Sequence, residues 1–180
     1  MFSLAVDPSL QLRLMEGHQA GLLFALTEKN RDYLRRWLPW LDLNTTAEDS
    51  RSFIECARVR YANREAFELG IWHREILVGV VGFHDLAWGP RRGEIGYWLD
   101  EAAQGTGIAT RSCRALIKHG FAELDLHRVE IRCAVDNAHS RAVPERLGFR
   151  LEGQLRQVEW LYDHFVDHCI YGLLAGEEIR

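Results

Sequence analysis

Two glycines one residue apart lie in a polar segment near the middle of the chain, and their position favours a site for phosphate groups. The segment lies between a predicted strand, Ile95 to Leu99, and a predicted helix that runs to about Leu124, and it reads Gln104, Gly105, Thr106, Gly107, Ile108, Ala109. The first N–H groups of a helix lack partners, and glycine lets the backbone approach an anion closely. A tight turn is the structural alternative. A Walker loop and a dinucleotide fingerprint are excluded, because the Gly-Lys-[Ser/Thr] ending and the third glycine are absent.

Two further polar side chains start helices close to this segment. Thr110 lies in the first turn of the helix after the glycines, where its hydroxyl can bond a phosphate or simply start the helix. Asn137 follows a predicted strand, Arg128 to Val135, and is placed to cap a short helix from Ala138 to about Leu147. The order of strand, glycine segment, helix and strand therefore predicts a phosphate-binding unit.

The remaining elements predict an α+β fold that would position these residues. Apolar spacing predicts helices from Gly17 through Leu26 and from about Ala47 to Arg64, with an aromatic stretch between them that Pro39 ends. Further strands are predicted at Leu10 to Leu14, Phe67 to Trp72, Ile76 to Leu86, Phe149 to Leu161 and Phe165 to Leu173. Because no linker or repeat interrupts the chain, we expect one domain, residues 1–180, with about seven strands in a mixed, mostly antiparallel sheet and helices on both faces.

Composition argues against several classes of function. The formal net charge of −4 argues against a general binder of nucleic acid, which would carry a basic patch. No stretch approaches the roughly 20 apolar residues of a membrane-spanning helix, so we expect no membrane partner and a cytoplasmic location. The cysteines form no CxxC pair and lie in apolar segments, which predicts buried free thiols at Cys56, Cys113, Cys133 and Cys169.

The histidines do not predict a metal site. His164 and His168 form an HxxxH pattern, which brings two ligands together only on a helix. In the strand predicted here, four residues span about 13 Å, too far for one metal ion. The other histidines considered have no recognisable partner spacing, although one of them can line an acceptor pocket: His84, His127 and His139.

From Ile95 to Leu173 the sequence resembles the GNAT acetyltransferases, and among them the Rim-type enzymes that acetylate the N-termini of ribosomal proteins. The pyrophosphate loop of that family reads [Gln/Arg]-x-x-Gly-x-[Gly/Ala], which residues 104–109 match. The resemblance also covers Ile95-Gly-Tyr-Trp-Leu-Asp100 before the loop and Ser140-Arg-Ala-Val-Pro-Glu-Arg-Leu-Gly-Phe149 after it. It implies the GNAT fold, whose strand before the loop carries a bulge and splays from its neighbour, here the fourth and fifth strands, and acetyl-CoA as co-substrate without a metal.

The resemblance also implies how acetyl-CoA would be held. Backbone groups of Tyr97, Trp98 and Leu99 would pair with the pantetheine arm, and an N–H at or next to Leu99 would donate to the thioester carbonyl. Asn137 matches an asparagine that usually contacts the pantetheine amide region. The glycine segment would hold the pyrophosphate.

Two side chains match catalytic positions of the Rim-type enzymes. Many GNAT enzymes carry a thiolate-protonating tyrosine seven residues after the asparagine, but Pro144 stands there and is expected to kink or shorten its helix. Ser140 matches a serine that reaches the CoA sulfur, and it receives the thiolate-protonating role. Glu159 matches a glutamate that holds or deprotonates the amine. An ordinary first-turn serine and a solvent-facing strand glutamate are the structural alternatives.

The sequence is compatible with more than one kind of acceptor. The resemblance favours the N-terminal α-amino group of a protein such as a ribosomal protein. Trp37 and Trp40 are candidates for a wall of the acceptor site, with core packing as the alternative. Two other hypotheses are acetylation of a small amine, such as an aminoglycoside or a polyamine, and a non-catalytic acyl-CoA sensor, which the proline at position 144 motivates. Because Rim-type relatives are commonly dimers, the resemblance also admits a homodimer.

Overall fold

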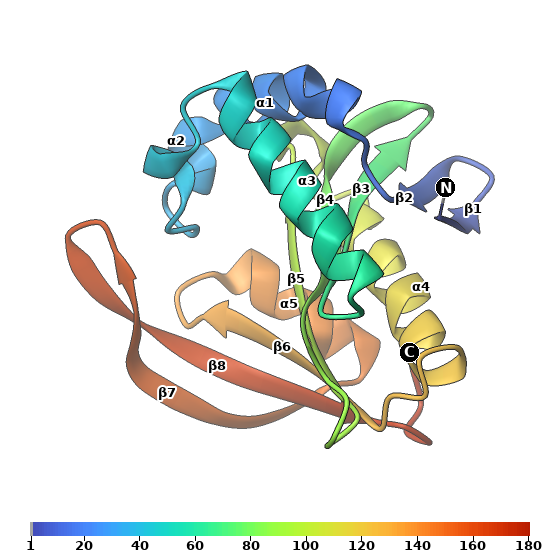
Figure 1. The fold of residues 1–180 in the computed structure, drawn as a ribbon. Coiled ribbons are helices and arrows are strands. Elements are labelled where there is room, and N and C mark those ends of the chain that lie inside the picture. The colour runs from blue at the N-terminus through green and yellow to red at the C-terminus, as the bar shows by residue number, and fades with distance from the viewer. Residues whose placement is uncertain (1) are drawn as a thin grey trace.

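The computed structural model describes residues 2–180, which build one eight-stranded sheet with helices on both faces (Figure 1). The strands, in the spatial order β1-β2-β3-β4-β5-β6-β8-β7, are β1 Ser3–Asp7, β2 Leu10–Arg13, β3 Phe67–His73, β4 Ile76–Ala87, β5 Arg92–Leu99, β6 Arg128–Ala134, β7 Arg150–Leu161 and β8 His164–Leu174. The helices are α1 Ala20–Lys29, α2 Arg31–Leu34, α3 Ala47–Ala62, α4 Ile108–Ala122 and α5 Ala138–Leu147. All neighbouring strands run antiparallel except β5 and β6. The predicted α+β fold with a mixed sheet is therefore confirmed.

The sheet gains one strand over the predicted seven because β1 forms at the N-terminus. β1 pairs with β2 across a tight turn, in which the Asp7 carboxylate accepts hydrogen bonds from the backbone N–H and the hydroxyl of Ser9, both at 2.8 Å. A five-residue strand carries too short an alternation to be read reliably from sequence, and here the turn and the pairing create it.

The two parallel strands separate partway along their length. β5 and β6 pair only from Arg92 opposite Arg128 to Ile95 opposite Ile131, and beyond these residues β5 continues to Leu99 without a partner on that side. This divergence confirms the splay expected between the fourth and fifth strands of the sequence prediction. We call the resulting opening the splay.

The expected bulge lies on the strand next to the predicted one. Between β4 and β5 the register changes so that Phe83 faces Ile95 while Asp85 faces Glu94, which leaves His84 of β4 as the extra residue. The resemblance places the bulge on the strand before the glycine segment. A bulge re-aims the side chain of the bulged strand, so the consequence here falls on His84.

Buried apolar side chains on both sides of the sheet hold these elements together. The larger cluster packs the sheet against α4, through residues such as Phe83 and Leu116, and the smaller one packs it against α1 and α3, through residues such as Leu23 and Ile54. α3 begins with a capping box, in which Thr46 and Asp49 bond each other's backbone N–H. Within residues 2–180, no helix has both the length and the apolar character that a membrane crossing requires.

Candidate active site

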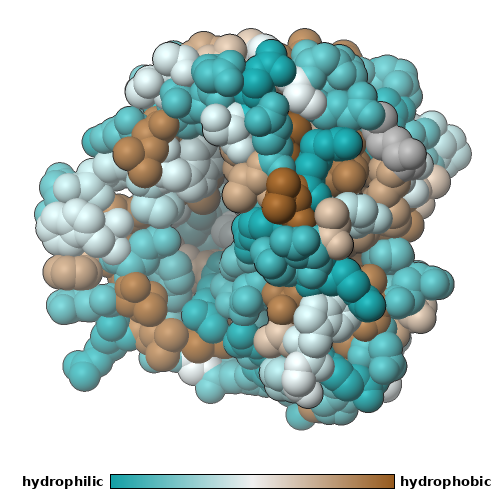
Figure 2. All heavy atoms as spheres, viewed as in Figure 1, coloured by the Kyte–Doolittle hydropathy of each residue, from teal (hydrophilic) through white to brown (hydrophobic). Residues whose placement is uncertain are grey.

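A large cleft enters the molecule at the splay. It has a volume of about 1240 Å³, and Figure 2 shows it as a hollow in the middle of the face that Figure 1 presents. One part is lined by the glycine segment and by α5, and the other by the loop between α2 and α3 and by the ends of β7 and β8. Strand β5 separates the two parts, because alternate side chains point to opposite faces of a sheet.

The glycine segment forms the start of α4, as the sequence predicts. Gly105 and Gly107 have φ values of +71° and +76°, a left-handed conformation that favours glycine, and nothing lies within 4 Å of where a Cβ would stand on either residue. Gly107 caps α4 without a side-chain bond, so the first N–H groups of the 15-residue helix face the open space above the loop. The residues present thus fit the pyrophosphate of acetyl-CoA, which remains a prediction.

The free edge of β5 offers backbone donors to the cleft. Asp100 N–H donates to the Val78 carbonyl of β4 at 2.8 Å, so this residue faces β4. In an antiparallel ladder the direction of the backbone groups alternates, which turns the N–H groups of Tyr97 and Leu99 away from β4 and into the splay. This orientation suits the pairing and the oxyanion contact that the resemblance implies for Tyr97 and Leu99, whereas the same alternation turns the backbone groups of Trp98 toward β4.

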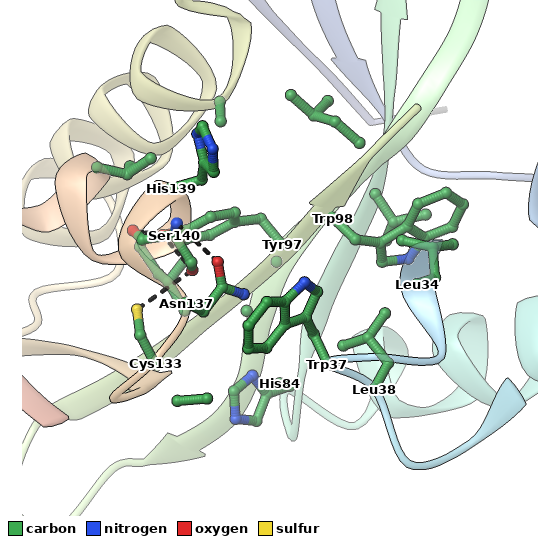
Figure 3. Close-up of a pocket in the computed structure, with 18 of the residues that line it drawn as sticks. Leu34, Trp37, Leu38, His84, Tyr97, Trp98, Cys133, Asn137, His139 and Ser140 are labelled. Atoms are coloured by element: carbon green, nitrogen blue, oxygen red, sulfur yellow. Dashed lines mark hydrogen bonds between the residues drawn. The ribbon is translucent and has the colours of Figure 1, made fainter. Parts of the chain in front are cut away.

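Ser140 lies in a network of hydrogen bonds on the α5 side of β5 (Figure 3). Its hydroxyl oxygen is 3.1 Å from the Tyr97 hydroxyl and 3.2 Å from the Cys133 sulfur. Asn137 caps α5, because its side-chain oxygen accepts from the Ser140 N–H at 3.1 Å. The cap uses only this oxygen, and Asn137 lines the cleft, so its amide N–H groups remain for a second contact. Burial raises the pKa of the Cys133 thiol, although the Ser140 and Tyr97 hydrogen bonds act against it.

Of the two effects expected of Pro144, a kink or a shortened helix, α5 does not show the shortening. The helix continues three residues past it to Leu147. Proline has no N–H for the carbonyl four residues earlier, which belongs to Ser140. The Tyr97 hydroxyl donates to that carbonyl at 2.8 Å instead. Burial raises the pKa of Tyr97 well above its usual range, so this hydroxyl keeps its proton.

Glu159 lies on the opposite side of the splay and has a histidine partner. Its carboxylate is 3.2 Å from Nε2 of His168, and both residues line the cleft. The pairing of β7 and β8 is irregular between Leu155 and Glu159, which places Glu159 near the turn of this hairpin. Glu159 is thus half-buried, with 28% of its side chain exposed, and its catalytic role remains a prediction.

Aromatic side chains and a contact made by Tyr162 border the cleft next to the loop between α2 and α3. Trp37 and Trp40 line it, and the Trp40 ring lies 6.2 Å from the Trp98 ring. At the turn of the β7–β8 hairpin, the Tyr162 hydroxyl donates to the Leu38 carbonyl and accepts from the Leu41 N–H at 3.2 Å. The hairpin and the loop between α2 and α3 are therefore joined over the cleft. We call this contact the Tyr162 bridge.

Three histidines belong to the cleft: the sequence prediction misses His168, whereas His84 and His139 are among the three histidines of which one is expected to line an acceptor pocket. His84, His139 and His168 all line the cleft, and Figure 3 shows His84 directed toward Trp37 and the space below Asn137. No spacing in the sequence reveals these positions, since each histidine lies on a different element. Among the thiols, Cys113, Cys133 and Cys169 are buried and free as predicted, whereas Cys56 is exposed. Within residues 2–180 no cluster of metal-binding side chains is present.

Known proteins share this sequence and this architecture. Residues 9–150 match the family described as acetyltransferase (GNAT) domain. The putative ribosomal N-acetyltransferase YdaF of Bacillus subtilis (strain 168) is 37% identical over 178 residues, which are 98% of this chain and 97% of that protein. The ribosomal-protein-serine acetyltransferase of Escherichia coli (strain K12) is 34% identical over 176 residues, 98% of either chain.

A solved structure is similar to this chain in both sequence and fold. RimL, an alpha-N-protein acetyltransferase of a ribosomal protein, has been solved in complex with coenzyme A. It superimposes with a TM-score of 0.93 at 31% identity, covering 96% of this chain and 98% of that one. The likeness therefore extends through both halves of the cleft.

Proposed function

Because this chain belongs to the GNAT acetyltransferase family and is therefore an acetyl-CoA-dependent N-acetyltransferase, we propose that its acceptor is the N-terminal α-amino group of a protein, with a ribosomal protein as the first candidate. One observation carries this proposal. The splay exposes the free edge of β5 between a pyrophosphate-type loop and a cleft bridged by Tyr162, in which a slender amine can meet a thioester. The names of the sequence relatives and of RimL support the choice of acceptor.

The residues on the α5 side of β5 would hold acetyl-CoA and complete the leaving group. Residues 104–109 and Thr110 would bind the pyrophosphate with N–H groups and a hydroxyl, and Asn137 the pantetheine amide region. The N–H of Leu99 would donate to the thioester carbonyl, where negative charge develops as the amine attacks; such a donor typically contributes about 3 kcal/mol. Ser140 would give its proton to the departing thiolate.

Glu159 would hold the acceptor amine on the other side of the splay or take its proton. The nucleophile must be a neutral amine, and an α-amino group with a pKa of about 7.7–8.0 is already neutral to about a tenth at pH 7. A weakly placed base is thus sufficient for an N-terminal acceptor. His168, 3.2 Å from the carboxylate, would fix its direction.

Trp37 and Trp40 would form a wall of the acceptor site. Trp40→Ala should raise the peptide KM and leave acetyl-CoA binding almost unchanged, since Trp40 contacts Trp98 on the acceptor side of β5 rather than the glycine segment. Titration with acetyl-CoA and steady-state kinetics measure the two quantities. Equal losses in both would assign these tryptophans to core packing.

Thermal unfolding with acetyl-CoA tests the cofactor site. At about 100 times its Kd, acetyl-CoA should add about 2.7 kcal/mol and raise the Tm by roughly 5–10 °C. ATP and NAD, which also carry phosphates, should have no such effect. An absent shift in a folded sample would contradict the assignment of residues 104–109.

An acceptor panel tests the rest of the proposal. Peptides with the N-termini of ribosomal proteins should be acetylated faster than the same peptides blocked at the α-amine, and faster than polyamines or aminoglycosides. Preferred turnover of a small amine would favour the second candidate, for which carboxylates in the cleft at Glu68, Glu94 and Glu159 provide partners for cations. Acetyl-CoA binding without turnover of any acceptor would favour a sensor.

We propose three further properties of the whole chain. Residues 1–180 would act as one domain, since one sheet runs through them. A homodimer would cover the apolar side chains that the β7–β8 hairpin exposes, which include Leu151, Trp160 and Phe165; light scattering measures this assembly. A cytoplasmic location would suit the free thiol that Cys56 exposes.

A further inference from the structure

His84 has a position in the cleft that the proposed roles leave unused. It is the extra residue of the β4 bulge, and its ring lies against Gly96 of β5. A Cβ added to Gly96 would stand 2.8 Å from Nδ1 of His84. Gly96 is the first residue after the pairing of β5 with β6 ends. Because of the bulge, and because Gly96 has no Cβ, Nδ1 of His84 can lie next to β5 at the residue where the splay begins.

Glu94 fixes the other nitrogen of this ring. Nε2 of His84 is 3.2 Å from Oε1 of Glu94, and the second carboxylate oxygen of Glu94 is 3.2 Å from the Arg132 guanidinium. Burial would raise the pKa of Glu94, but the hydrogen bond from His84 and the charges of His84, Arg132 and Arg92 outweigh it, and the pKa is lowered. Glu94 is therefore a carboxylate that accepts a hydrogen bond from the Nε2–H group of His84, which leaves the lone pair on Nδ1.

The face of β5 that His84 covers is opposite to the face that Ser140 contacts. Glu94, Gly96 and Trp98 alternate with Ile95, Tyr97 and Leu99 along the strand, and Tyr97 bonds Ser140 on the α5 side. His84 lies over Gly96, hence on the acceptor side with Trp98. An amine that attacks from the His84 side would expel a thiolate toward Ser140.

We infer that His84 is a further catalytic residue, which takes the proton of the acceptor amine through Nδ1 while Glu94 holds the ring in the required tautomer. The inference rests on the proposed acetyl transfer. The C–N bond forms as the C–S bond breaks, the amine proton passes to Nδ1, and the thiolate takes a proton from Ser140. The imidazolium then returns its proton to water, and Ser140 is reprotonated from water, so that one amine and one thioester give one amide and one thiol. Glu159 holds the amine from the opposite side.

Several charged groups surround His84 and enter any pH dependence. Glu68 of β3, Glu94 of β5 and Arg132 of β6 line the cleft beside it, and Arg60 of α3 donates to the His84 carbonyl at 2.6 Å. Burial raises the pKa of Glu68, against the charges of Arg60 and His84. Asp49, Glu159 and His168 line the same cleft from the other elements. The experiment therefore compares the pH profiles of kcat/KM of the wild type and several variants, rather than kcat/KM at a single pH.

The experiment measures kcat/KM for an N-terminal peptide from pH 5 to pH 9 in the wild-type protein, His84→Gln, His84→Ala and Glu159→Gln. In the wild type, log kcat/KM should fall at low pH with a slope of about 2, because both amine and imidazole must be unprotonated. The slope should drop to about 1 in both His84 variants, with kcat/KM about 100-fold lower near pH 8 and acetyl-CoA affinity retained. Added imidazole should restore part of the activity of His84→Ala. His18→Gln, an exposed histidine, is the matched control and should behave as the wild type.

Each result decides the inference. The inference would be overturned if kcat/KM of both His84 variants stayed within about threefold of the wild type from pH 5 to pH 9. It would also be overturned if the slope of log kcat/KM against pH changed only in Glu159→Gln, because Glu159 would then be the group that takes the proton. A wild-type protein that binds acetyl-CoA but acetylates no acceptor would instead overturn the proposed function. If His84→Ala fails to fold, His84→Gln carries the comparison. Glu94→Gln should lower kcat more than it changes the acceptor KM, as expected of a positioning residue.

Discussion

The Ser140 hydroxyl has two neighbours within hydrogen-bond distance, the Tyr97 hydroxyl and the Cys133 sulfur, at 3.1 and 3.2 Å. We propose that the serine, rather than either neighbour, protonates the departing thiolate. Burial raises the pKa of both Cys133 and Tyr97, so the thiol remains a weak nucleophile and the tyrosine already gives its proton to the Ser140 carbonyl.

Substitutions of Ser140 and Cys133 should separate the role of the hydroxyl from that of the thiol. Ser140→Ala should lower kcat by about 100-fold or more, because general acid catalysis is lost, while acetyl-CoA affinity measured by titration changes little. Cys133→Ala should keep most of its turnover, since direct attack on the thioester needs no acyl-enzyme. Loss of turnover in folded, acetyl-CoA-binding Cys133→Ala would make the thiol a participant.

Tyr97 and Pro144 should be energetically coupled through one carbonyl. Tyr97→Phe leaves the Ser140 carbonyl without a donor, because Pro144 supplies none, and should destabilise the protein by about 1–3 kcal/mol. In a Pro144→Ala background the alanine N–H can satisfy that carbonyl, so Tyr97→Phe should cost less there. A double-mutant cycle from chemical denaturation measures the difference. Additive costs would contradict the coupling.

At the level of elements, the β7–β8 hairpin is tied to the loop between α2 and α3 by the Tyr162 bridge. Tyr162→Phe removes both hydrogen bonds of the hydroxyl but keeps the ring, over which the Arg35 guanidinium lies at 3.7 Å from the centroid. We expect a higher KM for peptide acceptors with nearly unchanged acetyl-CoA affinity. Tyr61→Phe, whose ring packs beside Phe2 and Phe67, serves as the control tyrosine. An unchanged acceptor KM would mean that the bridge does not shape the acceptor site.

The elements differ in how well the sequence predicts them. Strands and helices with long periodic patterns, such as α3 and α4, are correctly predicted, and so is the place of the glycine segment at the start of α4, because its backbone conformation is local. β1 is missed because pairing creates it, and the bulge is assigned to β5 instead of β4 because register depends on two strands at once. For the same reason the partners of Glu159 and Tyr97 could not be predicted, since each contact joins elements far apart in sequence.

At the scale of the whole molecule, several carboxylates stabilise the fold through lowered pKa values. The Thr46 hydroxyl and the N–H groups of Thr45 and Thr46 lower the pKa of Asp49. Burial acts against Lys29 at Asp100, yet the hydrogen bond and charge of the lysine prevail and the pKa is lowered. A lowered native pKa means that the unfolded chain takes up the proton first as the pH falls.

The Tm should therefore fall as the solution is acidified. Stability from these carboxylates is complete above their unfolded values and is lost as the pH drops through the native values, which places the decline between about pH 5 and pH 2. Calorimetry from pH 6 to pH 2.5 measures it. Asp49→Asn should start from a lower Tm and decline less, whereas a Tm that stays constant to pH 3 would show that these groups titrate alike in both states.

The Tyr162 bridge has a consequence for when the reaction takes place. Because the Tyr162 bridge spans the cleft, an acceptor segment would enter it end first, in an extended conformation. The acetylated segment would leave by the same route. A tail already docked on its own folded body or on a partner cannot make that entry. Acetylation would then depend on whether the N-terminal segment of the acceptor is still free when it meets the enzyme. Once that segment is docked in an assembly, its acetylation state would no longer change.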